Sequence, residues 1–398
     1  MTASPLGRRL AVVLSHPNQY YSPWFRWLSA HHDLTLRVFY LWDSGVQPTR
    51  DPQFAATFAW DVDLLSGYES EFVPNAARSP SSFHFRGLYN PQLRPRLGAW
   101  RPDAILLFGY AYATHLMLVA WARLHRIPLL FRGDSHFLGR PVPPLRIRLA
   151  LRLLYAQFGA ITFVGAANRD YFRTLGVPDR RLFFAPHAVD QSLFDPARPE
   201  PRIAADRLRA QLGLAPATKV VLFAGKFSAA KQPRELLEAF LALRPRQAAL
   251  VFAGDGGEKS ALLDLARTAP AGSVHFLPFA NQSEMPSRYL LGDIFALPSR
   301  GLYETWGLAV NEAMHMGVPA LVSDRVGCQR DLVSDHETGW VFRAGDPTHL
   351  RDRLAAALAA DLPAFKPRVA ARIAGYTYAQ ASAGLLDALE FAPPGFQR

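Results

Sequence analysis

The sequence predicts an α/β protein with two doubly wound, Rossmann-like domains. Short apolar runs alternate with stretches of helical length along the 398-residue chain. The runs are apolar at almost every position, which is typical of parallel strands that helices cover on both faces of a sheet. They also fall into two series, one on each side of a proline-rich stretch at residues 195–201. Two such series predict two domains of this class.

The candidate strands set the expected limits of these domains. In the first half of the chain they cover residues 10–15, 34–41, 104–108, 129–131, 160–164 and 182–185. In the second half they cover residues 220–224, 249–253, 274–277, 294–297, 320–322 and 340–342. Between the two series, the prolines of residues 195–201 should not continue a helix, so we expect a linker there. We therefore expect an N-terminal domain at residues 1–197, a C-terminal domain at 198–375 and a final helical segment at 376–398.

Charge and cysteine content narrow the classes of function. The chain has 44 Lys and Arg against 33 Asp and Glu, which gives a net charge of +11. Such an excess favours polyanionic partners, namely nucleotide phosphates, nucleic acid or an anionic membrane face, although a general basic bias would have the same effect. The single cysteine, Cys328, excludes a disulfide framework and a cysteine-rich metal site. It fits a reducing compartment.

No stretch of the sequence predicts export or insertion into a membrane. The apolar residues 10–14 after Arg8 and Arg9 are too few for a signal peptide, and we expect a strand there. Residues 104–122 carry no formal charge and are nearly long enough to span a bilayer, but their pattern favours a strand, a turn and a helix. We expect a cytoplasmic protein, with peripheral contact at the inner face of a membrane as an open alternative.

Residues 140–155 interleave arginines with leucines after three prolines. A basic amphipathic helix lying on anionic lipid is one interpretation. A helix packed on the core with a solvated arginine edge is the other, and it is the one that we favour from the sequence. A nucleic-acid site would need exposed aromatic residues among the basic ones and a recognisable module. Neither is evident, so no nucleic-acid partner is expected.

The strongest chemical motif covers residues 298–314, directly after the candidate strand 294–297. We expect this motif to open a helix. The free N–H groups at the start of a helix and the positive end of its dipole favour an anion such as a phosphate. A glycine among them would allow a phosphate to approach the backbone closely. The residues expected to supply these amides are Trp306, Gly307 and Leu308.

Two carboxylates flank the expected amides. Glu304 and Glu312 would repel a phosphate, but they can accept hydrogen bonds from hydroxyl groups at either end of one. Their spacing, with seven residues between, resembles the E-x7-E signature of the retaining GT-B glycosyltransferases of glycosyltransferase family 4. The resemblance implies that Glu304 contacts the donor sugar and that Glu312 contacts the nucleotide ribose. Thr305, beside the first glutamate, is expected to line the same site.

A second motif follows the candidate strand 220–224. Gly225, Lys226 and Lys231 lie in the turn after it, and they include two of only five lysines in the chain. The arrangement resembles the basic diphosphate clamp of the same family. Such lysines can neutralise both phosphates of a nucleoside-diphosphate sugar and stabilise the departing diphosphate. Two solvated lysines at the start of a helix are the alternative.

Four further segments resemble the family. Gly254 follows the candidate strand 249–253, and Phe279 lies in a segment where family members bind the nucleobase. Pro278 stands where the family often has glycine, which removes one N–H donor. Residues 16–25 resemble an acceptor-side loop, and residues 186–190 resemble a segment for which we favour a structural role. Asp134 and His136 follow the candidate strand 129–131, and we nominate either of them for a place near the reacting sugar.

The resemblance implies a GT-B fold with the active site between the two domains. It implies a retaining glycosyltransferase that moves a sugar from a nucleoside-diphosphate donor, UDP- or GDP-linked, to a hydroxyl of a glycan, lipid-linked or small-molecule acceptor. No resident cofactor is expected, and the cationic residues would make a metal dispensable. The final helix, at residues 378–389, is expected to pack back on the first domain, as in relatives.

Three alternatives stay open at this point. Asp61 and Asp63 form a D-x-D tripeptide, which is the metal clamp of the other large glycosyltransferase fold. Residues two apart on a strand share a face, so the two carboxylates could chelate a metal. A sugar-nucleotide epimerase on the same two-domain scaffold is the alternative enzyme. A basic nucleic-acid-binding protein, supported by charge alone, is the alternative that is not an enzyme.

Overall fold

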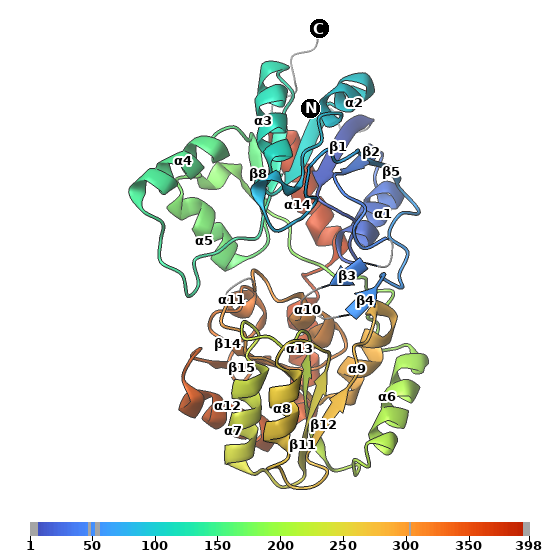
Figure 1. Cartoon of the computed structure of the whole chain (residues 1–398), viewed down its shortest axis with the longest axis vertical. Coiled ribbons are helices and arrows are strands. Elements are labelled where there is room, and N and C mark those ends of the chain that lie inside the picture. The colour runs from blue at the N-terminus through green and yellow to red at the C-terminus, as the bar shows by residue number, and fades with distance from the viewer. Residues whose placement is uncertain (1–6, 47–48, 52–55, 302–303, 393–398) are drawn as a thin grey trace.

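The chain forms two lobes, one above the other along the longest axis of the molecule (Figure 1). The computed structural model describes residues 7–46, 49–51, 56–301 and 304–392. Each lobe contains one parallel sheet with helices packed on it. The fold class expected from the sequence, two Rossmann-like α/β domains, is confirmed.

The first lobe is built on a seven-stranded sheet with strand order β5-β2-β1-β6-β7-β8-β9. Its strands are β1 (Arg8–Leu14), β2 (Leu34–Tyr40), β5 (Glu69–Phe72), β6 (Ala104–Phe108), β7 (Leu129–Arg132), β8 (Ala160–Phe163) and β9 (Leu182–Phe184). Its helices are α1 (Tyr21–His31), α2 (Leu93–Trp100), α3 (Ala113–Leu124), α4 (Leu145–Tyr155) and α5 (Ala166–Thr174). A small antiparallel hairpin, β3 (Thr49–Asp51) and β4 (Ala56–Phe58), lies outside this sheet.

The second lobe is built on a six-stranded sheet with strand order β12-β11-β10-β13-β14-β15. Its strands are β10 (Lys219–Ala224), β11 (Ala248–Ala253), β12 (Val274–Leu277), β13 (Ile294–Leu297), β14 (Ala320–Ser323) and β15 (Gly339–Phe342). Its helices are α6 (Pro199–Gln211), α7 (Pro233–Leu243), α8 (Lys259–Ala266), α9 (Met285–Leu291), α10 (Leu308–His315), α11 (Gln329–Leu332), α12 (Pro347–Ala359) and α13 (Lys366–Ile373). The last helix of the chain is α14 (Tyr378–Phe391).

Every candidate strand of the sequence analysis is a strand in the structure, with ends that differ by at most two residues. The strand–turn–helix interpretation of residues 104–122 is also confirmed, since β6 is followed by α3. Among the residues that the structure describes, no helix is both long and apolar enough to cross a bilayer. The sequence analysis missed β5 and the hairpin. β5 has the sequence Glu-Ser-Glu-Phe and lies at the sheet edge with no residue fully buried, so it lacks an apolar run.

The linker between the lobes is shorter than expected. α6 begins at Pro199, so the expectation that the prolines prevent a helix is wrong for Pro199 and Pro201. In the first turn of a helix the missing N–H of proline costs nothing, because that N–H has no partner within the helix. The domain limits at residues 197 and 375 stay a prediction.

The last helix lies on the first lobe, although it follows the second lobe in sequence (Figure 1). α14 packs against α1, β8 and β9. The indole Nε1 of Trp24 donates a hydrogen bond of 2.9 Å to Ser382 Oγ, and Arg8 donates one of 2.8 Å to the carbonyl oxygen of Leu389. Gly384 allows α14 to approach β9 closely, because a Cβ there would lie 1.9 Å from the carbonyl oxygen of Phe184.

We therefore predict that Gly384→Ala destabilises the protein, because the added methyl group forces α14 away from β9. The expected loss is about 1–3 kcal/mol, as for other overpacked cores, even though alanine is the better helix former. Thermal unfolding followed by circular dichroism measures it. Gly375→Ala is the control, since a Cβ at Gly375 meets no atom within 4 Å. Equal melting temperatures for the two variants would show that the close approach has no energetic importance.

Candidate active site

A cavity of about 390 Å³ lies between the two lobes. On the second lobe it is lined by the carboxyl ends of β10 and β11, at Ala224 and Ala253. On the first lobe it is lined by Gln19, Tyr20 and Trp60, among others. The carboxyl ends of parallel strands are where open α/β sheets bind ligands.

The fold brings nearly all the predicted site residues to this cavity. Those that line it are Asp134, Gly225, Lys226, Lys231, Gly254, Phe279, Glu304, Thr305, Trp306, Gly307, Leu308 and Glu312. His136 is not among the lining residues. The cavity therefore combines cations, a helix N-terminus and two glutamates, although these groups come from distant parts of the second half of the chain.

Lys231 and Glu304 form an ion pair at the cavity wall. The Glu304 carboxylate is almost fully buried, whereas the Lys231 side chain is partly exposed. Removing water from a carboxylate is unfavourable unless a cation or hydrogen-bond donors replace it. The lysine that sequence analysis nominated for a phosphate thus also neutralises the glutamate nominated for a sugar.

The N-terminus of α10 also faces the cavity. The first hydrogen bond of the helix runs from Val310 N–H to the Gly307 carbonyl, at 2.8 Å. The N–H groups of Leu308 and Ala309 precede it, and N–H groups at this position have no partner within a helix. Both residues line the cavity. The free N–H groups and the positive end of the helix dipole can therefore bind an anion in the cavity.

The sequence analysis expected a glycine here so that a phosphate could approach the backbone, but the structure gives another reason for Gly307. A Cβ there would lie 2.8 Å from Val326 Cγ1 and 3.2 Å from Leu297 Cδ2, so it would point at the packed interior. Gly307 also has a φ of 98°, which favours glycine. A Cβ at Gly225, by contrast, meets no atom within 4 Å. Of these two glycines, Gly225 is the one at which a ligand can come close to the backbone.

The Glu312 carboxylate is buried and held in place by hydrogen-bond donors. Gln282 Nε2 donates a hydrogen bond of 2.9 Å to its Oε1, and the Tyr289 hydroxyl donates one of 2.6 Å to its Oε2. Burial raises the pKa of the Glu312 carboxyl, while interactions with Tyr289, Gln282 and Tyr20 oppose that change. Each carboxylate oxygen still has a second lone pair, so the fixed side chain can accept a further hydrogen bond from a ligand.

Asp134 joins the two lobes at the cavity. Its Oδ2 accepts a hydrogen bond of 2.7 Å from Thr305 Oγ1 of the second lobe, and it lies 3.4 Å from His187 Nε2. Burial by itself would raise the pKa of Asp134, but the interactions with His187 and Thr305 outweigh it and lower the pKa to about 2. Burial lowers the pKa of His187. Asp134 is therefore an ionised carboxylate beside a neutral histidine at neutral pH.

The His136 side chain does not line the cavity. Its ring contacts the backbone of the second lobe instead. Its Nδ1 accepts a hydrogen bond of 3.0 Å from Leu138 N–H, which leaves the proton on Nε2. Nε2 lies 3.1 Å from the Glu304 carbonyl oxygen and donates to it. Burial lowers the pKa of His136. Both ring nitrogens are thus engaged, and the ring holds the backbone at Glu304 in place.

A segment of the first lobe covers the other end of the cavity. The ring of Phe58 lies 4.7 Å from the ring of Phe279, centroid to centroid. Asn281 Nδ2 donates a hydrogen bond of 2.8 Å to the carbonyl oxygen of Ala59. Trp60, which follows, lines the cavity itself. Residues 58–61 thus bring an indole ring to the side where a nucleobase was expected.

The two aspartates of the D-x-D tripeptide have separate partners. Asp61 accepts hydrogen bonds from the backbone N–H of Ser283, at 3.1 Å, and from its hydroxyl. Asp63 accepts from the N–H groups of Leu65 and Ser66, at 3.0 and 3.1 Å, and these bonds lower its pKa. Among the described residues, no group of three or more His, Cys, Asp and Glu could hold a metal ion. Asp61 links the lobes, and Asp63 shapes its own loop.

Some residues that line the cavity could not be recognised as site residues from the sequence. Met285 and Tyr289 belong to α9, whose residues are almost all buried, and their pattern is that of an ordinary core helix. Only the position of α9 beside α10 directs the Tyr289 hydroxyl to Glu312. Gln19 and Tyr20 lie in the expected acceptor-side loop, but nothing in the sequence singled them out within it.

Sequence comparison finds a match to a known family over part of this chain. Residues 204–376 match the model of the glycosyl transferases group 1. A D-inositol 3-phosphate glycosyltransferase from Xylanimonas cellulosilytica is 30% identical over 62% of this chain and 60% of its own length, and one from Nocardia farcinica is 31% identical over 55% and 49%. The chain thus spans between about half and three fifths of these relatives. A GDP-mannose-dependent alpha-(1-6)-phosphatidylinositol monomannoside mannosyltransferase from Mycobacterium tuberculosis is 29% identical over 76% of this chain and 78% of its own length.

Solved structures show the same architecture over nearly the whole chain. Anabaena HepE in complex with UDP and glucose superposes with a TM-score of 0.64 at 19% identity, over 96% of this chain and 97% of that one. A glycosyltransferase from Rickettsia africae superposes with a TM-score of 0.72 at 12% identity, over 96% and 98%. At these identities the likeness concerns the fold. The chain therefore has the GT-B fold, and its residues 204–376 match the model of the group 1 glycosyl transferases.

Proposed function

We propose that the protein is a retaining glycosyltransferase of family 4 that transfers a sugar from a nucleoside-diphosphate sugar to an acceptor hydroxyl. One observation carries the proposal: two lysines, a helix N-terminus and two glutamates line one cavity between the lobes. The relatives that are named glycosyltransferases support it. UDP- and GDP-sugars are the donors that we favour, and the acceptor is a glycan, a lipid-linked sugar or a small molecule.

The donor diphosphate would lie between Lys226, Lys231 and the first amides of α10. Lys231 offers three donors, so it can bind a phosphate oxygen while it stays close to Glu304. Glu304 would then accept hydrogen bonds from the sugar. Glu312 would accept one from the ribose, with Tyr289 holding the carboxylate in position. The apolar end of the cavity, at Phe279, would take the nucleobase.

Catalysis in this proposal depends on charge. As the bond to the sugar breaks, negative charge grows on the diphosphate, and the two ammonium groups and the amides stabilise it. The acceptor attacks from the same face, and the departing phosphate takes its proton. Asp134, ionised and held by Thr305, would lie near the reacting sugar and oppose the positive charge that develops there. No carboxylate is assigned as a nucleophile.

We predict that a nucleoside-diphosphate sugar raises the melting temperature of the protein. A ligand that binds only the folded state stabilises it by about 2.7 kcal/mol at a hundredfold excess over Kd. A thermal-shift screen of UDP-, GDP- and ADP-sugars identifies the donor, and proton NMR of the product with an acceptor gives the anomeric configuration. An inverted product would contradict retention, and an isomerised sugar formed without acceptor would indicate an epimerase.

Lys231→Ala is expected to lower kcat by a factor of about 10²–10³, because a group that stabilises charge in the transition state is lost. Steady-state kinetics with the identified donor measure the change. Lys259→Ala is the matched control: it removes the same charge, but Lys259 pairs with Asp255 outside the cavity lining. A wild-type rate for Lys231→Ala would refute the clamp.

Chelation is expected to leave turnover unchanged. Lys226 and Lys231 supply the positive charge that a metal would otherwise bring to the diphosphate, and Asp61 already bonds to Ser283. The measurement is the initial rate with EDTA and with added Mn²⁺. If EDTA abolishes turnover and Mn²⁺ restores it, the D-x-D pair Asp61 and Asp63 must be reconsidered as a metal site.

A further inference from the structure

A stripe of leucines is exposed along α4. The side chains of Leu145, Leu149 and Leu153 are 65%, 49% and 68% exposed. They are four residues apart, so they lie one above the other on the same face of the helix. Only Tyr155 of this helix is buried. The interpretation favoured from the sequence, a helix whose leucines are packed on the core, is therefore wrong for this face.

The opposite side of α4 holds the helix on the lobe. Leu151 and Leu154 are partly buried and pack against the hydrophobic core of the first lobe. With 3.6 residues per turn, Arg146 and Arg152 fall on either side of the leucine stripe. Both arginines are exposed. The helix therefore presents an apolar line with a positive charge on each side of it.

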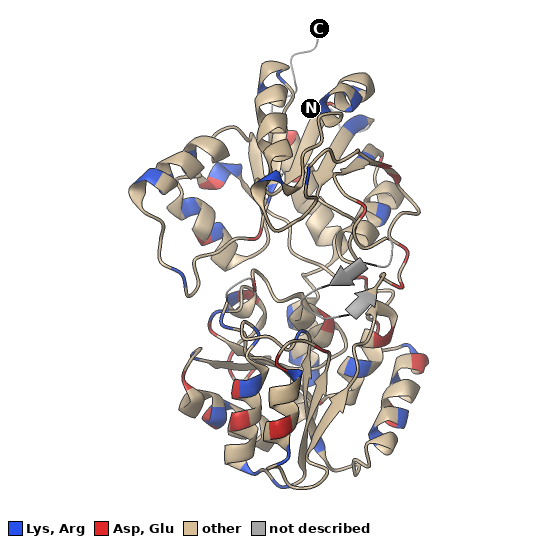
Figure 2. Ribbon diagram, viewed as in Figure 1, with Lys and Arg blue, Asp and Glu red and all other residues tan. Residues whose placement is uncertain are grey.

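The charge of α4 and of the segments directly next to it in the sequence is of one sign. Residues 135–169 contain five arginines and no acidic residue. Figure 2 shows these basic positions at the outer edge of the first lobe. No carboxylate among the described residues pairs with Arg146 or Arg152.

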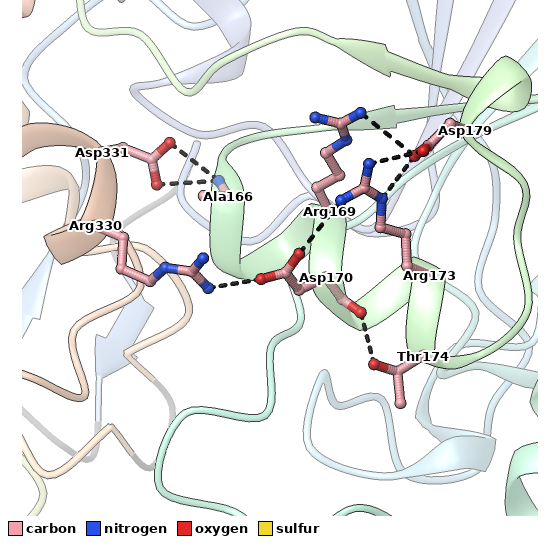
Figure 3. Close-up of polar contacts among 8 residues, drawn as sticks. All are labelled: Ala166, Arg169, Asp170, Arg173, Thr174, Asp179, Arg330 and Asp331. Atoms are coloured by element: carbon pink, nitrogen blue, oxygen red, sulfur yellow. Dashed lines mark hydrogen bonds and ion pairs between the residues drawn. The ribbon is translucent and has the colours of Figure 1, made fainter.

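The first acids after α4 in the sequence, on and after α5, have partners of their own. Asp170 pairs with Arg330 at 2.7 Å, and Asp179 accepts two hydrogen bonds of 2.7 Å from Arg173 (Figure 3). Arg169 also approaches Asp179, at 3.4 Å. The acidic side chains on and just after α5 are thus already paired with other arginines. They leave the positive charge of α4 uncompensated.

We infer that α4 lies flat on the surface of an anionic membrane. The three leucines would enter the boundary between headgroups and acyl chains, and the arginines on both sides would reach lipid phosphates. Exposed leucine is unfavourable in water but favourable at such a boundary, and each nearby arginine adds electrostatic attraction to an anionic leaflet. A second copy of the chain fits less well, because face-to-face packing of two α4 helices would oppose arginine to arginine.

Docking through α4 would hold the cavity close to the lipid. The loop between β7 and α4 carries Asp134 at one end and enters α4 at the other. The same loop contacts the second lobe, where Arg140 approaches the carbonyl oxygen of Gly301 at 3.5 Å. The membrane contact itself does not depend on the proposed glycosyl transfer, because neither the leucines nor the arginines of α4 line the cavity.

Vesicle sedimentation with the full chain and no nucleotide tests the inference. We expect binding to phosphatidylcholine vesicles that contain about one third phosphatidylglycerol, and weaker binding to pure phosphatidylcholine. The double variant Leu149→Glu and Leu153→Glu should lower binding about tenfold or more, because each change places a charge in the apolar boundary. Arg146→Gln with Arg152→Gln should lower it too, and the difference from the wild type should shrink at high salt, which screens the attraction between arginine and lipid phosphate.

The control places the same charges elsewhere. Ile203 and Leu263 are exposed hydrophobic residues of the second lobe, and Ile203→Glu with Leu263→Glu should bind vesicles like the wild type. Melting temperatures in solution check that the variants fold. Wild-type binding by the leucine variant overturns the inference, as does a loss that is equal in the control. A lack of vesicle binding together with leucine-dependent dimers, seen by light scattering, would assign the stripe to a second copy instead.

Discussion

The geometry of the cavity depends on hydrogen bonds that cross between the lobes at residues 304–311. Thr305 donates to Asp134, and His136 donates to the Glu304 carbonyl. Asn311 donates to the carbonyl oxygen of His187, at 3.0 Å, while it accepts from the indole of Trp306. Buried polar groups of this kind are costly when they lose their partners. The loop that carries Glu304 is therefore fixed by the first lobe, although it belongs to the second.

Three further contacts hold the lobes together on either side of this junction. At one side both carboxylate oxygens of Asp331 accept from Ala166 N–H, at 3.0 and 3.1 Å, and cap the start of α5 (Figure 3). Arg330 and Asp170 add an exposed ion pair, which contributes little in water. At the other side Asp61 bonds to Ser283. The first and third contacts are made with backbone N–H groups, which gives them a fixed direction that an exposed ion pair lacks.

The sequence predicted the sheets well because parallel strands are buried on both faces and are therefore apolar throughout. It failed where burial is partial, as at β5, and where a residue type has two uses, as at Pro199, which can end or begin a helix. The site residues could be predicted because their charges are unusual in their surroundings. The residues that hold them in place could not be predicted, since the Tyr289 hydroxyl contacts Glu312 only because α9 packs beside α10. The reason for Gly307 also needed the fold, because only the structure shows where its Cβ would point.

The position of α14 has a mechanical consequence. The polypeptide passes from one lobe to the other twice, before α6 and again between α13 and α14. Two covalent crossings act as a two-point hinge, which permits rotation about the line that joins them and resists twisting or sliding. Tyr376 lies at the second crossing, with its ring 5.9 Å from Trp306 and 6.0 Å from Phe184. The second crossing thus lies beside Trp306, which lines the cavity, so any rotation of one lobe about this point would displace the cavity wall at Trp306 less than the parts of the cleft farther away.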